Sequence, residues 1–153
     1  IGFTTQSSMG AIPANVENLT DKQGVSEEIA SFTAPLGATM GMPGCAGFWP
    51  VINAIFVANV MGLGWGPTEY GKLILVALLV SLGTVGVPGT ATITTTALFA
   101  AMGLPLEMVV LLAPISTLAD MGRTATNVTA ANASALIVAA SENKLDKEVF
   151  NRA

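Results

Sequence analysis

The chain has 153 residues, of which 52% are hydrophobic and 10% are charged, and its formal net charge is −4. Soluble domains carry about 25% charged residues, so this composition argues against a water-soluble domain and favours an integral membrane protein. The sequence has no histidine and a single cysteine, which excludes a Ser-His-Asp triad, an internal disulfide and a paired-cysteine zinc site. The acidic balance excludes a nucleic-acid-binding face, and the composition does not indicate an enzyme.

Residues 1–31 are the most polar stretch before the apolar body of the chain. Residues 1–13 are small and rich in hydroxyl groups, and residues 14–31 indicate a helix end, a turn at Gly24 and a new helix with Ser26 as its N-cap. The chain begins in the middle of this pattern, without a basic leader, so we expect it to be a piece of a longer protein.

An apolar segment follows at residues 32–62 and is interrupted by glycine and proline. A continuous helix through residues 40–45 would lose backbone hydrogen bonds and clash at Pro43, so two helical pieces around an unwound stretch are predicted. Residues 63–71 are rich in glycine and predict a loop, with a tryptophan and a tyrosine that suit a membrane interface.

The rest of the chain divides at a second glycine- and proline-rich stretch, residues 83–90. The apolar halves on either side are too short to span a bilayer, so residues 72–103 are predicted to form a re-entrant hairpin. Residues 106–141 predict one long helix, and a charged tail follows from residue 143. Basic residues favour the cytoplasmic side, and their positions near both ends of the chain agree with both ends lying there.

Asp120 and Arg123 have the strongest claim to a functional role among the charged residues. They lie three residues apart on one helix face, which Thr124 and Asn127 extend. Charges inside a membrane are costly and usually mark a site or a pathway. The alternative is an internal salt bridge that holds the helix in the core, but it does not explain the adjacent polar strip.

The two breaks, at residues 40–45 and 83–90, could also be functional, because broken helices offer helix ends and free carbonyls to transported molecules and ions. The alternative is a pair of proline kinks filled by neighbouring helices. Single hydroxyl groups, such as those of the threonines between residues 90 and 96, more often bond back to the helix backbone. Cys45 is predicted to be a small buried residue, because no general base is available to activate it.

Several motifs occur in an informative order. They are Thr5-Gln6-Ser7-Ser8, then Leu36-Gly37-Ala38-Thr39 leading into Gly41-Met42-Pro43-Gly44-Cys45, then the glycine-rich stretch 83–89, and finally Asp120-Met121-Gly122-Arg123-Thr124 followed by Asn127-Val128-Thr129. Together they resemble the C-terminal transport core of the dicarboxylate/amino acid:cation symporter family, which has the glutamate-transporter fold, over essentially the whole chain. The pattern at residues 41–47 is most similar to the cystine-importing branch.

This chain departs from the family pattern at positions that bind cations. The family usually has Asn-Met-Asp-Gly-Thr at residues 41–45 and a further carboxylate at the position of Ala131. With those polar ligands missing, the resemblance implies a cation site built from backbone carbonyls. The expected coupling ion is sodium, with the proton as the alternative. The expected residues of that site are Thr39, Met42, Ser81, Leu82 and Thr84.

The resemblance implies an all-α integral membrane fold of the glutamate-transporter type. Its expected parts are the second arm of a first re-entrant hairpin (1–22), a broken transmembrane helix (27–62), a second re-entrant hairpin (72–104), the last transmembrane helix (106–142) and a cytoplasmic tail (143–153).

The resemblance also implies a secondary active symporter. It would move cystine, an acidic amino acid or a dicarboxylate with a cation gradient by an elevator-type mechanism, as a homotrimer of the full-length protein in the cytoplasmic membrane of a bacterium. The alternatives are an ion or anion channel pore and a membrane structural module without a substrate. The residues implied to bind the substrate are Ser7, Ser8, Met42, Cys45, Val87, Gly89, Asp120, Arg123, Thr124 and Asn127.

Overall fold

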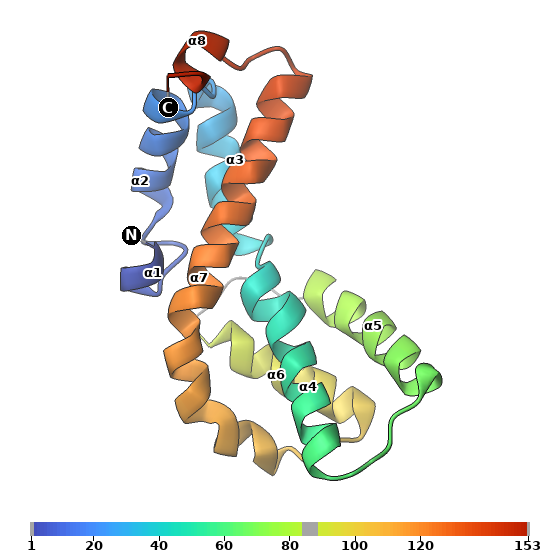
Figure 1. The fold of residues 1–153 in the computed structure, drawn as a ribbon. Coiled ribbons are helices and arrows are strands. Elements are labelled where there is room, and N and C mark those ends of the chain that lie inside the picture. Colours follow the sequence, from blue (N-terminus) through green and yellow to red (C-terminus); the bar gives the residue numbers. More distant parts are fainter. Residues whose placement is uncertain (1, 84–88, 153) are drawn as a thin grey trace.

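The computed structural model describes residues 2–83 and 89–152, and the chain is helical through most of this part (Figure 1). The one extended pairing in these ranges is an isolated antiparallel bridge between Val25 and Leu145. The predicted all-α class is therefore confirmed. With η for a π-helical turn, the elements are α1 (Gly2–Thr5), α2 (Ile12–Glu17), η1 (Asn18–Lys22), α3 (Glu27–Thr39), η2 (Pro43–Phe48), α4 (Trp49–Val60), α5 (Pro67–Leu82), α6 (Thr90–Met102), α7 (Glu107–Ser141) and α8 (Lys147–Phe150).

α7 runs along the length of the molecule, and two groups of helices are built on it, while α1 and η2 contact it directly (Figure 1). Near its C-terminal end, Ala135 and Ala139 join a core with Leu19 of η1 and with Ala30 and Ala34 of α3. Small side chains allow helix backbones to approach closely, which is common where helices pack within membranes. This group holds α2, η1 and α3 against the C-terminal half of α7.

The second group, α4, α5 and α6, packs against the N-terminal part of α7. Its core contains Val57 of α4, Leu73 of α5, Leu98 and Phe99 of α6, and Leu112 of α7. Large apolar side chains supply most of the burial here, in contrast to the small residues of the first core. The middle of α7 lies between the two cores and carries the polar residues.

The predicted interruption is confirmed at residues 40–42, whereas residues 43–45 already belong to η2. α3 ends at Thr39, residues 41 and 42 have no regular structure, and η2 begins at Pro43 before the chain continues into α4. A proline at the start of a helical turn costs no hydrogen bond, because the first N–H groups of a helix have no partner within it. The chain therefore restarts at Pro43 with a wide turn.

The loop predicted for residues 63–71 is wrong in its second half, because α5 already begins at Pro67. Proline favours the first position of a helix, and the carboxylate of Glu69 accepts a hydrogen bond from the N–H of Gly66 at 2.9 Å. These helix-start signals are present in the sequence, and they favour a helix here despite the neighbouring glycines. α5 therefore extends several residues beyond the arm predicted from residue 72.

Ser26 precedes α3 as predicted, but its expected capping role is wrong. Its side chain makes no cap bond, and its Oγ is buried without a partner among the described residues. Its N–H donates instead to the carbonyl of Lys144 at 3.2 Å, beside the bridge between Val25 and Leu145. The tail after α7 is thus fastened to the turn before α3, where Lys144 also forms an exposed ion pair with Glu28.

Among the described helices, the run Glu27–Val60 is long and apolar enough to cross a membrane by length and composition, and α6 is apolar but shorter. α7 is long enough to cross a membrane but is not apolar enough by the same measure. The predicted span at residues 106–142 therefore rests on the resemblance. Residues 84–88, which include the tip of the predicted hairpin, lie outside the described residues.

Candidate functional site

A polar cavity of about 530 Å³ lies against the middle of α7. Its walls come from α7, from η2, from the start of α6 and from the turn at residues 6–9, so distant parts of the sequence meet here. Val87 lies outside the described residues. Every other residue predicted to bind the substrate lines this cavity, while its role in binding stays a prediction: Ser7, Ser8, Met42, Cys45, Gly89, Asp120, Arg123, Thr124 and Asn127.

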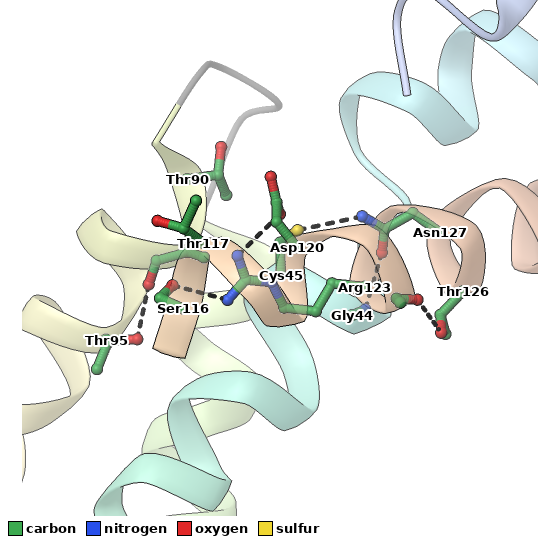
Figure 2. A network of polar contacts seen from close by, with 12 residues as sticks. Gly44, Cys45, Thr90, Thr95, Ser116, Thr117, Asp120, Arg123, Thr126 and Asn127 are labelled. Atoms are coloured by element: carbon green, nitrogen blue, oxygen red, sulfur yellow. Dashed lines mark hydrogen bonds and ion pairs between the residues drawn. The ribbon is translucent and has the colours of Figure 1, made fainter. Parts of the chain in front are cut away.

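Arg123 and Asp120 form an ion pair on the wall of the cavity (Figure 2). The Arg123 NH2 group lies 2.8 Å from Asp120 Oδ1, and its NH1 group donates to Ser116 Oγ at 2.9 Å. The Arg123 side chain is 4% exposed and that of Asp120 is 31% exposed. The internal salt bridge that was the alternative to a functional role therefore exists. It borders a cavity, however, and the carboxylate of Asp120 is more accessible than the guanidinium of Arg123.

Asn127 connects α7 to the restarted helix at η2 (Figure 2). Its Oδ1 accepts a hydrogen bond from the N–H of Gly44 at 2.8 Å, and its Nδ2 donates to Cys45 Sγ at 3.3 Å. The N–H of Gly44 is available because the first turn of a helix leaves its donors unpaired. Asn127 is 1% exposed, so the amide is a fixed part of the wall. Among the described residues, one bond is made by its Nδ2, which carries a second N–H for a further partner.

Gly44 permits this close approach. A Cβ atom at this position would lie 2.5 Å from the backbone oxygen of Arg123, a distance that real Cβ atoms do not adopt. The absence of a side chain at Gly44 therefore lets η2 touch the backbone of α7 and brings Cys45 up to the cavity.

The threonines of α6 mostly bond back to their own helix, as predicted. Thr95 Oγ1 donates to the carbonyl of Ala91 at 2.6 Å. Thr94 Oγ1 also lies 3.0 Å from the carbonyl of Cys45, so this hydroxyl ties α6 to η2. Thr90 and Thr92 line the cavity at the start of α6.

Sequence reasoning missed several residues of the wall. Ser116 and Thr117 line it from α7, and Gln6 and Met9 line it from the N-terminal turn. Ser116 lies four residues before Asp120 and so shares its helix face, a spacing that could have revealed it. Gln6 has a positive φ of 51°, which no sequence signal indicated.

The described residues contain no cluster of acidic, cysteine or histidine side chains that could hold a metal ion. Of the residues predicted for a carbonyl cation site, Met42 lines the cavity, Thr39 ends α3, and Ser81 and Leu82 end α5, which packs against η2. Thr84 lies outside the described residues, and the carbonyl site stays a prediction.

Ala131, where the family has a carboxylate, is buried against α3. A Cβ atom on Gly37 would lie 2.4 Å from the Cβ of Ala131, so the two helices touch at this point. A longer acidic side chain would need this contact to open. An acidic residue at position 131 would therefore require a wider crossing of α3 and α7.

The arrangement can hold a small charged molecule. A carboxylate, a guanidinium and an amide face one space whose volume is in the range of small-ligand sites. Opposite charges close together suit a zwitterion, because its ammonium and carboxylate groups can each find a partner.

Residues 1–141 match the model of the sodium:dicarboxylate symporter family. The L-cystine uptake protein TcyP of Bacillus thuringiensis (strain Al Hakam) is 38% identical over 151 residues, which cover 98% of this chain and 32% of that protein. TcyP of Shouchella clausii is 38% identical over 150 residues, which cover 97% of this chain and 32% of that protein.

An uncharacterized symporter of Haemophilus influenzae is 42% identical over 130 residues, which cover 84% of this chain and 30% of that protein. The chain thus spans about a third of the length of the curated relatives it matches. The matched region includes η2 and the polar face of α7, where the cavity lies. The chain therefore belongs to the sodium:dicarboxylate symporter family, a family of membrane transporters and not of enzymes.

Proposed function

We propose that this chain is the transport core of a symporter that moves an amino acid, cystine or an acidic amino acid, across the membrane with a cation gradient. The observation that supports the proposal is the placement of Asp120, Arg123 and Asn127 on one cavity wall. Similarity to the L-cystine uptake proteins of Bacillus and Shouchella supports cystine as the substrate. Glutamate and aspartate would suit the same residues, because each carries an ammonium and a carboxylate group at one end and a second carboxylate at the other.

The roles of the side chains follow from their charges. Asp120, the accessible carboxylate, would accept the substrate's ammonium group. Arg123 would then pair with a carboxylate at the far end, since a guanidinium binds a carboxylate through two parallel hydrogen bonds. Asn127 and Ser8 would hold the α-carboxylate, and the expected gate is the stretch 84–91, most of which lies outside the described residues.

Substrate binding would rearrange the ion pair between Arg123 and Asp120. Arg123 now bonds to Asp120, so a zwitterion that binds both would replace one internal ion pair by two contacts with the ligand. This exchange avoids leaving a buried charge unpaired, which would be costly in a low-dielectric site. A ligand with only one charged group would not compensate both residues.

Sodium is the proposed coupling ion, with the proton as the alternative. It would bind backbone carbonyl oxygens, which suit hard cations, near Thr39, Met42, Ser81, Leu82 and Thr84. Because polar side chains are missing at Gly41, Pro43 and Ala131, we expect fewer bound ions than in relatives with the full motif. Uptake measured against sodium concentration and pH tests this, and a steeply cooperative dependence on sodium would contradict it.

The full-length protein would supply what this chain lacks. We propose a multi-pass protein of a bacterial cytoplasmic membrane that assembles as a homotrimer and moves its substrate by an elevator-type mechanism. In it, residues 72–104 would enter and leave the membrane from the side opposite the tail. Accessibility labelling of Lys72→Cys and Leu106→Cys, with Lys144→Cys as the marker of the other side, tests the hairpin. Labelling of Lys72→Cys and Leu106→Cys from opposite faces of the membrane would contradict the hairpin.

Radiolabelled uptake by the full-length protein tests the function. Arg123→Ala should abolish uptake of cystine and aspartate, and Arg123→Lys should weaken it, because lysine lacks the planar fork. Arg152→Ala is the matched control, since Arg152 is an exposed tail residue paired with Glu148. Wild-type uptake by Arg123→Ala would make Arg123 a structural ion-pair partner. A flux that does not saturate with substrate would favour a channel pore, and no substrate-dependent flux would favour a structural module.

A further inference from the structure

The guanidinium of Arg123 has a partner that does not line the main cavity. Its central carbon lies 4.4 Å from the centre of the Trp49 ring, and both side chains are buried. Trp49 borders instead a small neighbouring space of about 10 Å³, together with Asn53 and Ser116. The indole therefore lies behind the guanidinium and can act on a bound substrate through Arg123 without lining the cavity itself.

The partners of Arg123 restrain it in different directions. Asp120 and Ser116 accept hydrogen bonds from its two terminal nitrogens, and such bonds lie in the plane of the guanidinium. The group could still tilt out of that plane, because its Nε has no partner among the described residues. The ring of Trp49 resists this tilt by attracting the cation to its electron-rich face.

Trp49 is itself firmly held. It is the first residue of α4, directly after η2, and it packs in a small core with Met42, Cys45 and Ala91. Its support therefore comes from the same restarted helix that brings Cys45 to the cavity. A ring on so fixed a base can define the orientation of a neighbouring guanidinium.

We propose that Trp49 is a positioning residue that holds the guanidinium plane of Arg123 at the angle needed to bind a carboxylate through two hydrogen bonds. Trp49 would thereby determine the preference for a side-chain carboxylate over a neutral group. This inference rests on the proposed function, in which Arg123 meets the distal carboxylate. It adds a residue outside the cavity that controls how well Arg123 does so.

Glutamate and glutamine form a suitable pair of probes, because they have nearly the same shape and differ in the distal carboxylate. The experiment measures how strongly each inhibits uptake of labelled cystine or aspartate, whichever the wild-type full-length protein transports. The readout is the ratio of the two inhibition constants in Trp49→Leu, Trp49→Phe and Arg123→Lys, a variant that should keep a weakened uptake. Phe48→Leu is the control, since Phe48 is the adjacent aromatic residue and is 40% exposed.

Trp49→Leu should reduce the preference for glutamate about tenfold and Trp49→Phe about threefold, because phenylalanine keeps a weaker cation-binding face. The maximal rate and the inhibition by glutamine should stay near wild type, as should all values for Phe48→Leu. If Trp49→Leu does not fold, the ratio in Trp49→Phe decides.

An unchanged ratio in both Trp49 variants, or an equal loss of affinity for glutamate and glutamine, would overturn the proposal, since Trp49 would then act only in packing. If Arg123→Lys lowers the ratio and the Trp49 variants do not, only the positioning role fails. If Arg123→Lys also leaves the ratio unchanged, the proposed role of Arg123 fails as well.

Discussion

The side chain of Asn127 accepts a hydrogen bond from the backbone N–H of Gly44 at 2.8 Å, across 83 positions of sequence. This bond joins the long helix α7 to the point where the chain restarts after its break. It satisfies a donor that the break leaves open, and it places Cys45, the next residue, beside the amide nitrogen of Asn127. The break and the polar face of α7 therefore form one structural unit.

The first prediction concerns the close approach at Gly44. Gly44→Ala should destabilise the protein by about 1–3 kcal/mol, as overpacking typically does, because its Cβ would lie 2.5 Å from the Arg123 carbonyl oxygen. Gly47→Ala is the matched control in the same turn, since its Cβ would meet Pro43 only at 4.0 Å. Thermal unfolding of the detergent-purified full-length protein measures the difference, and equal melting temperatures for the two variants would refute the contact.

The second prediction concerns the amide of Asn127. Asn127→Ala should cost about 1–3 kcal/mol of stability, because it leaves the buried N–H of Gly44 without an acceptor. Asn132→Ala removes an amide from the same helix whose Oδ1 is buried without a partner among the described residues, so it should be neutral or slightly stabilising. The comparison is again made by thermal unfolding, and a larger loss in Asn132→Ala would contradict the assignment.

The third prediction concerns Asp120. Asp120→Asn should abolish uptake of every amino acid substrate, because the substrate's ammonium group loses its counter-charge while the buried Arg123 loses its ionic partner. Glu107→Gln is the control, since it removes a charge from the first turn of the same helix, away from the cavity. Radiolabelled uptake by the full-length variants provides the measurement. Retained uptake of any amino acid by Asp120→Asn would show that another group binds the ammonium.

The fourth prediction concerns the contact between the tail and the turn before α3. Gly24 has a φ of +68°, and a Cβ there would lie 2.4 Å from the carbonyl oxygen of Asp146. Gly24→Ala should therefore destabilise the protein by more than the roughly 1–2 kcal/mol expected for the backbone conformation alone. Gly62→Ala isolates that backbone term, because Gly62 has a similar φ of +63° and no atom within 4 Å of the added Cβ.

The readout for this pair is proteolysis of the C-terminal tail together with thermal unfolding. Gly24→Ala should release residues around Asp146 for cleavage, whereas Gly62→Ala should not. Identical cleavage in both variants would mean that the tail is held by other contacts, such as the exposed ion pair of Lys144 and Glu28.

Much of the architecture could be predicted from the sequence, because it depends on local chemistry. Pro43 lacks an N–H, so a break near it was foreseeable, and the long stretch from residue 106 to residue 141 indicated α7, which continues through Pro114. The polar face of α7 followed from the spacing of Asp120, Arg123 and Asn127. The start of α5 at Pro67 was also a local signal, and the glycines around it led to a wrong prediction of a loop.

The helical class, the first break and the polar strip could all be predicted, since each depends on residues within a few positions of one another. Three contacts depend instead on the tertiary structure: Asn127 bonds to Gly44, Trp49 covers Arg123, and Ser26 gives its N–H to the tail while its side chain makes no cap bond. These contacts depend on how α7 crosses the restarted helix and the turn before α3. That crossing depends on close packing. Gly44 has no side chain and so lets two backbones touch, and the ring of Trp49 lies in a small core, which fixes its contact with Arg123.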